Sequence, residues 1–215
     1  MKQFAVIGLG HFGSSIATTL FEMGFDVLAI DNNEEKVQEM SDKVTHAVQA
    51  DSTNENALIA LGVKNFDVAI VSIGQDMQAN ILTTLILKEL GVKQVVAKAR
   101  TEHHGKVLYR IGADRVVFPE RDMGIRVAHN LVSANIIDYI ELSPNFSIVE
   151  IVAPESIVGK TLRELDMRAK FGVNIIAIKT GENINLTPKA DDRIKRNDII
   201  IVVGKTDRLR KLETL

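Results

Sequence analysis

The sequence contains no cysteine among its 215 residues. This absence excludes disulfide bonds, cysteine-based metal sites and thiol nucleophiles. The formal net charge is only −2, so the chain lacks the excess of basic residues that binds nucleic acid or an anionic membrane surface. No apolar run approaches the roughly 20 residues that span a bilayer, and the first apolar run begins at residue 3, which leaves no room for a cleavable signal. We therefore expect a cytoplasmic protein without direct membrane insertion and without a nucleic-acid partner, which acts at a membrane only through another protein.

Motifs of common enzyme classes are also missing. The chain has no His-x-x-Glu-His, no Gly-x-Ser-x-Gly and no His/Asp pair at catalytic spacing. All five histidines fall within the first 129 residues, so the C-terminal part offers no histidine as an acid or base. The sequence therefore predicts no catalytic residues and a protein that is not an enzyme.

Apolar runs bounded by turn residues recur at about 20-residue spacing in the first half of the chain, with helical periodicity between them. This alternation predicts an α/β domain with a parallel sheet, helices on both faces and right-handed crossovers. Ligands of such a sheet bind at the carboxyl ends of the strands. The six runs are residues 3–7, 26–30, 46–50, 67–73, 94–99 and 115–118.

The pattern changes after residues 142–145, where strands at 147–152, 173–179, 184–186 and 198–204 are expected. A capping box of Thr161 and Glu164 predicts a short helix between the first two of them. We therefore expect an N-terminal domain of residues 1–133 and a small α+β domain of residues 134–215.

Two apolar helices are candidates for contacts between subunits. Residues 77–90 carry a wider apolar stripe than one covering face requires, so this helix either meets another subunit or is buried within its own domain. Apolar side chains spread around much of the segment 121–140, which predicts a crossover helix that leaves the sheet and packs on a neighbouring protomer.

The best-defined motif is the glycine turn that follows the first strand. Gly8 permits a tight turn, Gly10 lets backbone N–H groups approach a pyrophosphate, and Gly13 lets the next helix pack closely on the strand. Asp31 ends the second strand, where it can accept hydrogen bonds from ribose hydroxyls. The pattern predicts a Rossmann-like nucleotide-binding domain, and the alternative is that the glycines only serve a tight turn. The candidate binding residues in these two segments are Gly8, Gly10, His11, Phe12, Gly13, Asp31 and Asn32.

Further candidates follow the third and fourth strands, at the same predicted edge of the sheet. Asp51 and Ser52 follow the third strand, and Ile73 and Gly74 follow the fourth, where an adenine edge and a ribose would reach them. The alternative for Asp51 and Ser52 is a helix cap.

Charged residues follow the fifth and sixth strands. Lys98 and Arg100 end the fifth strand and are placed to face phosphates. Glu120 follows the sixth strand, and an acid beside a phosphate needs a bridging divalent cation. The alternative is that Glu120 is a solvated surface residue.

Taken together, segments that span nearly the whole chain resemble the RCK/KTN family, the cytosolic gating subunits of bacterial Ktr and Trk potassium-uptake systems. The resemblance is far more specific than the glycine turn alone. It rests on residues 4–10, 45–48, 82–90, 106–108, 111–114, 119–124 and 168–172.

The resemblance implies dimers that assemble into an octameric ring and gate a membrane potassium-translocating subunit. It also implies that ATP activates and ADP inactivates, with Lys98 near the phosphates and Glu120 binding a divalent cation, Mg or Ca, together with ATP. The resemblance also implies that the C-terminal lobe binds cyclic di-AMP at its dimer interface, which shuts the transporter. The matching candidates in this chain are Arg168 for phosphate, Asn174 and Ile175 for the base, and Pro188 for apolar contact.

One residue departs from the family pattern, and two other functions stay open. The family commonly has arginine where this chain has His11, and histidine is neutral for much of the time near neutral pH, so discrimination of ATP from ADP is expected to be weaker or pH-dependent. An NAD(H)-binding oxidoreductase or redox sensor is the main alternative, because Asp31 suits the adenosine ribose of NAD as well. A purely structural assembly module with a vestigial glycine turn is the third.

Overall fold

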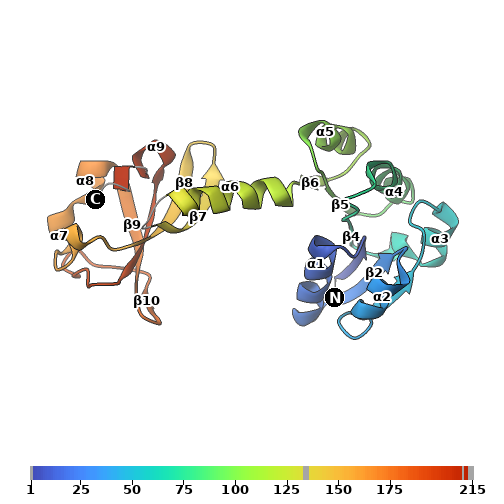
Figure 1. The fold of residues 1–215 in the computed structure, drawn as a ribbon, viewed down its shortest axis with the longest axis horizontal. Helices are drawn as coiled ribbons and strands as arrows, with labels where there is room; N and C mark the ends of the chain where they lie inside the picture. The colour runs from blue at the N-terminus through green and yellow to red at the C-terminus, as the bar shows by residue number, and fades with distance from the viewer. Residues whose placement is uncertain (1, 133–135, 210, 213–215) are drawn as a thin grey trace. The chain divides into compact units, whose positions relative to one another are not determined.

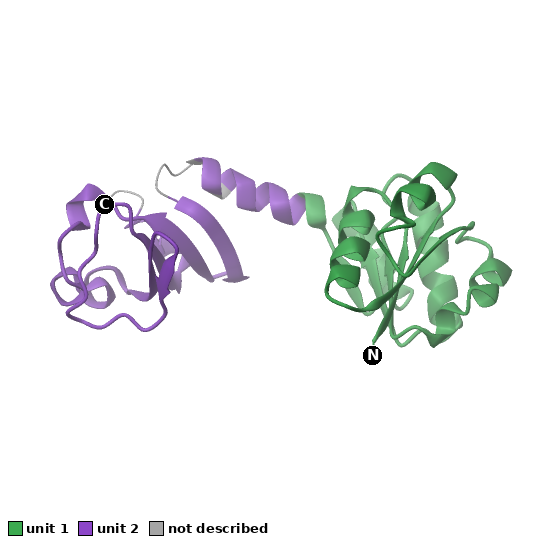
Figure 2. Ribbon diagram, turned by 90° about the horizontal axis from the view of Figure 1, so that it is seen from below, with its two compact units in different colours: residues 1–120 green, residues 121–215 purple. Residues whose placement is uncertain are grey.

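The protein consists of two compact units, Met1–Glu120 (unit 1) and Arg121–Leu215 (unit 2), which Figure 2 colours separately. The structure is a computed structural model that describes residues 2–132, 136–209 and 211–212. The domain boundary expected between residues 133 and 134 lies outside the described residues. In the described part of the chain, no helix is both long and apolar enough to cross a membrane.

Unit 1 is built on a six-stranded parallel sheet with the strand order β3-β2-β1-β4-β5-β6 (Figure 1). The chain order reverses between β1 and β4, where α/β sheets of this kind bind their ligands. The expected α/β class and the parallel sheet are confirmed. The strands are β1 (Gln3–Ile7), β2 (Asp26–Asp31), β3 (His46–Gln49), β4 (Val68–Val71), β5 (Gln94–Lys98) and β6 (Arg115–Val117). The helices are α1 (His11–Glu22), α2 (Glu34–Met40), α3 (Glu55–Ala60), η1 (Val63–Asn65), α4 (Met77–Glu89) and α5 (Glu102–Arg110).

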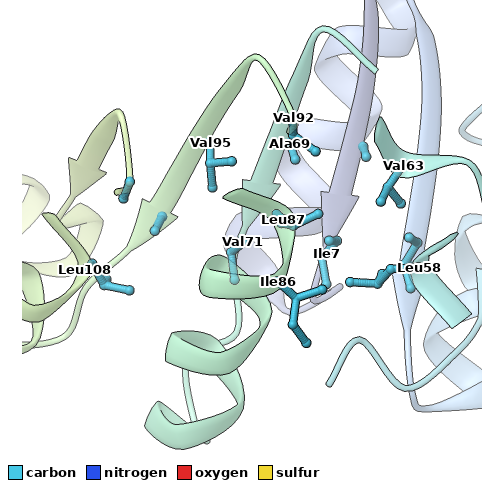
Figure 3. Close-up of a cluster of buried hydrophobic side chains, with 14 of the residues drawn as sticks. Ile7, Leu58, Val63, Ala69, Val71, Ile86, Leu87, Val92, Val95 and Leu108 are labelled. Atoms are coloured by element: carbon cyan, nitrogen blue, oxygen red, sulfur yellow. The ribbon is translucent and has the colours of Figure 1, made fainter. Parts of the chain in front are cut away.

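Helices cover both faces of this sheet, so alternate side chains of each central strand point into two different hydrophobic cores. Ile7 of β1 belongs to the cluster formed with α3, α4 and α5, whereas Val6 belongs to the cluster formed with α1 and α2. Ile86 and Leu87 of α4 lie beside Ile7 and Val71 in the first cluster (Figure 3). Strands buried on both faces have near-continuous apolar runs, which explains why the sequence pattern located them.

Unit 2 is an antiparallel sheet with the order β10-β9-β11-β8-β7 and short helices against one face. Alternate residues of β8 and β11, such as Val149 and Val202, are buried, as expected for a sheet with one covered face. The predicted capping box of Thr161 and Glu164 is present at the start of α7. The elements are β7 (Ile136–Ser143), β8 (Phe146–Val152), η2 (Glu155–Ile157), α7 (Leu162–Leu165), α8 (Met167–Phe171), β9 (Val173–Thr180), β10 (Asn183–Asn185), β11 (Ile199–Lys205) and α9 (Thr206–Leu209).

The helix expected over residues 121–140 is wrong in its second half. Helix α6 (Pro119–Val132) covers the first part, but Ile136, Tyr139 and Ile140 lie in β7, which pairs with β8. The apolar residues of such a short run fit the periodicity of a helix as well as that of a strand, and this segment forms a strand because it pairs with β8. The packing of α6 on another protomer stays a prediction.

Candidate nucleotide-binding site

A cavity of about 400 Å³ opens at the carboxyl ends of the strands of unit 1. Its walls come from the last residues of β1, β2 and β5, the segments that follow β1, β2, β3 and β4, and the first residues of α1, α2, α4 and α6. The volume lies within the range of about 300–1,000 Å³ that small-molecule sites occupy. The lining residues are Ile7, Gly8, Gly10, His11, Phe12, Ile30, Asp31, Asn32, Lys36, Asp51, Ser52, Thr53, Ser72, Ile73, Gly74, Gln75, Asp76, Ala79, Lys98 and Glu120.

The three glycines of the turn differ in what surrounds them. Gly8 has φ +93°, and a Cβ there would lie 2.9 Å from the backbone nitrogen of Ile73. A Cβ on Gly13 would lie 1.9 Å from the carbonyl oxygen of Gly8, so α1 packs on the end of β1 at a distance that only glycine allows. A Cβ on Gly10 would meet nothing within 4 Å. Gly8 and Gly13 therefore have the turn and packing roles expected of them, and Gly10 leaves space on the cavity side.

The N-terminus of α1 offers donors that no side chain of the helix start occupies. Gly10 is the N-cap residue and makes no side-chain capping bond, and the first turn of α1 holds no acid. The α-helices α2, α3, α4 and α5 each have a capping side chain at this position, namely Asn33, Asn54, Asp76 and Thr101. Free N–H groups and the helix dipole favour an anion at the start of α1, and this end lies in the wall of the cavity.

Asp31 holds the glycine turn in place and faces the cavity. Its Oδ2 accepts a hydrogen bond from the backbone N–H of Leu9 at 2.6 Å, and its Oδ1 accepts one from the N–H of Asn33 at 2.9 Å. The side chain of Lys36 on α2 lies 3.7 Å from Oδ2. Each carboxylate oxygen has a second lone pair, so Asp31 retains acceptor sites for hydroxyl groups of a ligand.

A buried cation lies across the cavity from these groups. Lys98 is 8% exposed, and its Nζ donates to Oε1 of Glu120 at 2.5 Å and lies 5.7 Å from the centre of the Phe12 ring. A buried ammonium needs such partners, because its desolvation is costly. The hydrogen bond from Lys98 lowers the pKa of Glu120 below its usual value, and the carboxylate is 68% exposed to solvent, so Glu120 is ionised at neutral pH.

Asp51 and Ser52 do not cap a helix, so this alternative is wrong. The N-cap of α3 is Asn54. Asp51 instead accepts hydrogen bonds from the hydroxyl and the backbone N–H of Thr53, and these bonds lower the pKa of its carboxyl group. The buried hydroxyl of Ser52 is hydrogen-bonded to Thr83 of α4 at 2.9 Å.

The structure brings together most of the predicted site residues of unit 1. Two do not line the cavity: Gly13 packs beneath the turn, and the exposed Arg100 lies outside. Eight lining residues were not predicted: Ile7, Ile30, Lys36, Thr53, Ser72, Gln75, Asp76 and Ala79. Lys36 could have been found from its place in the first turn of the helix that follows Asp31, because that turn points back toward the same sheet edge. The predicted residues that line the cavity are Gly8, Gly10, His11, Phe12, Asp31, Asn32, Asp51, Ser52, Ile73, Gly74, Lys98 and Glu120.

The described residues supply too few side-chain ligands to hold a metal ion without a bound nucleotide. Among the side chains that the structure describes, no group of three or more His, Cys, Asp or Glu residues is placed to hold an ion. Glu120 supplies one carboxylate, which is already bonded to Lys98. A divalent cation at Glu120 would therefore need most of its ligands from phosphate oxygens and water, which is the usual coordination of Mg²⁺ beside a nucleotide.

The candidates in unit 2 are not gathered in one place. Asn174 lines an open pocket of about 520 Å³ together with the cationic residues Lys170, Lys205 and Arg208. Ile175 packs against the core of unit 2. Arg168 is exposed on α8, and the half-buried Pro188 lies between β10 and β11; neither lines that pocket.

Comparison with known proteins agrees with this architecture. Residues 4–119 match the TrkA-N domain, and residues 146–215 match the TrkA-C domain. The chain is 52% identical to "Ktr system potassium uptake protein C" of Bacillus subtilis (strain 168) over 212 residues, which cover 99% of this chain and 96% of that protein.

Two solved structures resemble it as well. The GsuK RCK domain is 26% identical with a TM-score of 0.56, over 99% of this chain and 46% of that one. The structure of GsuK bound to ADP is 30% identical with a TM-score of 0.53, over 61% of this chain and 34% of that one. The chain therefore belongs to the family of TrkA-N/TrkA-C potassium-uptake proteins that includes the Ktr system proteins.

Proposed function

We propose that this protein is the nucleotide-sensing regulatory subunit of a potassium-uptake system, cytoplasmic and peripheral to the membrane through its transporter, and not an enzyme. The observation that carries the proposal is the joint presence, in one cavity, of an uncapped helix N-terminus, a buried lysine and an acid placed for ribose hydroxyls. Such a set suits an adenine nucleotide, and GsuK, 30% identical over the matched part, is bound to ADP in one of its structures. We infer that ATP activates and ADP inactivates.

The parts of a nucleotide would be held by different residues. The N–H groups of the glycine turn and the start of α1 would bind phosphate oxygens, and Lys98 would neutralise a phosphate charge. Asp31 would accept hydrogen bonds from the ribose. His11, the first residue of α1, lines the same wall, so its imidazole would lie beside the bound phosphates.

Glu120 provides a route from the cavity to the rest of the chain. It is the second residue of α6, and the chain passes through this helix from unit 1 into unit 2. A terminal phosphate would compete with Glu120 for Lys98, and a divalent cation held with ATP would recruit Glu120 back to the phosphates. Because a ligand shifts a conformational equilibrium only by its differential affinity for the two states, this exchange is where ATP and ADP would differ.

Assembly and a second ligand belong to the same proposal. We infer that the subunit forms homodimers that assemble into an octameric ring on the membrane potassium-translocating subunit. Cyclic di-AMP, as an inhibitor, would bind at the dimer interface of unit 2, where the candidates that lie apart within one subunit would contact it from two subunits. These candidates are Arg168, Asn174, Ile175 and Pro188. The cationic residues Lys170, Lys205 and Arg208 around the pocket at Asn174 favour an anionic ligand there.

Calorimetry tests the nucleotide part of the proposal. The full chain is titrated with ATP, ADP and NADH, each with and without Mg²⁺ or Ca²⁺. We expect ATP and ADP to bind and the divalent cation to strengthen the binding of ATP more than that of ADP. Tight binding of NADH with no binding of ATP or ADP would favour the NAD(H) sensor or oxidoreductase instead. Co-purification with a potassium transporter, followed by transport measured with ATP and ADP, tests the gating part.

A further inference from the structure

Asn80 of α4 contacts two segments of the cavity wall without lining the cavity itself. The side chain is completely buried, with 0% exposure. Its Nδ2 donates hydrogen bonds to the carbonyl oxygens of Ile73, at 2.7 Å, and Lys98, at 3.1 Å. Both of these residues line the cavity. One buried amide therefore joins the segment after β4 to the end of β5.

This bridge begins where the backbone pairing of the two strands stops. The last paired residues of β4 and β5 are Val71 and Ala97, so the ladder of parallel strands does not extend to Ile73 and Lys98. A side-chain amide has two N–H donors and can serve two carbonyl groups at once, whereas a serine or threonine hydroxyl has one donor and an ionised carboxylate has none. Asparagine is thus chemically suited to this position.

The two bridged segments determine the width of the anion-binding part of the cavity. The backbone of Ile73 packs directly on the glycine turn, since a Cβ on Gly8 would lie 2.9 Å from its nitrogen. On the other side, a Cβ on Gly74 would lie 3.4 Å from Nζ of Lys98. A displacement of either segment would therefore change the spacing between the glycine turn and Lys98.

The Asn80 side chain also carries a destabilising feature. Its Oδ1 is buried and has no hydrogen-bond partner among the described residues, and such an orphaned acceptor is destabilising. An apolar residue of similar volume would avoid this penalty but would release both carbonyl groups. The two donated bonds are therefore what the position requires.

We propose that Asn80 is a positioning residue of the candidate nucleotide site, which holds the segment after β4 and the end of β5 at the spacing where the glycine turn and Lys98 contact one phosphate chain. The identity of the ligand rests on the function proposed above. The positional role rests on contacts within unit 1 alone.

Hydrogen exchange without any ligand tests the positional role. Asn80→Leu removes both bonds, and Thr84→Val is the matched control, because Thr84 is equally buried on the same helix and bonds only to the backbone oxygen of Asn80. We expect amide exchange in residues 72–76 and 98–101 to accelerate about tenfold in Asn80→Leu but not in Thr84→Val, with residues 26–31 unchanged in both. Asn80→Ser, which is smaller and also loses the double bridge, gives the same signature if the leucine variant folds poorly.

Calorimetry with ADP gives the second readout. We expect the Kd of Asn80→Leu to rise about tenfold, while that of Thr84→Val stays within about twofold of the wild type. Three results would overturn the proposal. They are unchanged exchange of residues 72–76 and 98–101 in Asn80→Leu, equal acceleration in Thr84→Val, and accelerated exchange in Asn80→Leu with an unchanged Kd for ADP. If the wild type binds no adenine nucleotide, the proposed function fails, and the exchange data still decide the role of Asn80.

Discussion

Two glycine-to-alanine substitutions in the same turn should separate stability from binding: Gly13→Ala should lower the stability, and Gly10→Ala should lower the affinity for ADP. At Gly13 a Cβ would lie 1.9 Å from the carbonyl oxygen of Gly8 and 2.9 Å from the hydroxyl of Ser72. The nearest atom belongs to the backbone, so no side-chain rotation relieves the clash. Helix α1 and the end of β1 would have to separate by about 1.5 Å to restore ordinary contact.

The magnitude for Gly13→Ala follows from two opposing effects. Overpacking of this kind costs up to about 3 kcal/mol. The higher helix propensity of alanine returns at most about 1 kcal/mol in the first turn of a helix. We therefore expect the free energy of unfolding to fall by about 2 kcal/mol, which corresponds to a drop in Tm of roughly 5–10 °C for a unit of this size.

Gly10→Ala is the matched control. Its Cβ would meet nothing within 4 Å, and its φ of −76° suits any residue. The small loss from placing alanine at an N-cap is offset by the stiffer unfolded chain, so stability should change by less than about 0.5 kcal/mol. The added methyl group occupies the space beside the N–H groups of α1, so the affinity for ADP should fall at least about tenfold.

The assay is urea denaturation followed by circular dichroism, combined with ADP calorimetry on each folded variant. The reasoning about close packing is refuted if Gly13→Ala unfolds at the same urea concentration as the wild type. The reasoning about phosphate approach is refuted if Gly10→Ala binds ADP with the affinity of the wild type.

Three further predictions concern stability in both units. Leu87→Ala should lower the free energy of unfolding by about 2–5 kcal/mol, because this side chain is fully buried between α4 and the sheet. Leu82 on the same helix is 39% exposed, so Leu82→Ala should lower it by less than about 1 kcal/mol in the same denaturation assay. Thr161→Ala should destabilise unit 2 by about 1 kcal/mol through loss of the α7 cap, measured by the same method. The bidentate hydrogen bonds from Arg126 lower the pKa of Asp138 in the folded state. The stability that this pair contributes is therefore present above the ordinary carboxyl pKa of about 4 and is lost as the pH falls through the lower pKa of the folded state. The difference in unfolding free energy between wild type and Asp138→Asn should shrink below about pH 4, and a constant difference down to pH 2 would contradict this assignment.

Most of unit 1 could be predicted from sequence because its strands are buried on both faces. Runs such as residues 26–30 are continuously apolar, and the carboxyl ends of parallel strands must share one edge, so Asp31, Ile73 and Lys98 were expected to lie together before any contact was known. Lys36 lies one step further along the chain, in the first turn of α2, so the positions of the strand ends alone do not indicate it.

Local patterns were less informative where tertiary pairing decides. The segment at Ile136 and Ile140 carries apolar residues at spacings that fit a helix or a strand, and its pairing with β8 cannot be read from residues nearby. The role of Asn80 could not be predicted from the sequence either, because its amide donates to carbonyl groups that lie 7 and 18 positions away in the chain.

The strand order of unit 2 has a consequence for biosynthesis. Strand β11 follows the other strands of its sheet in the chain, yet it lies at the centre, between β9 and β8. A ribosome must therefore release Lys205 before the two halves of this sheet can join, long after the strands of unit 1 are complete. The half-sheets would expose unpaired strand edges to solvent during that delay, so unit 2 is the part of the nascent chain more exposed to aggregation before it folds.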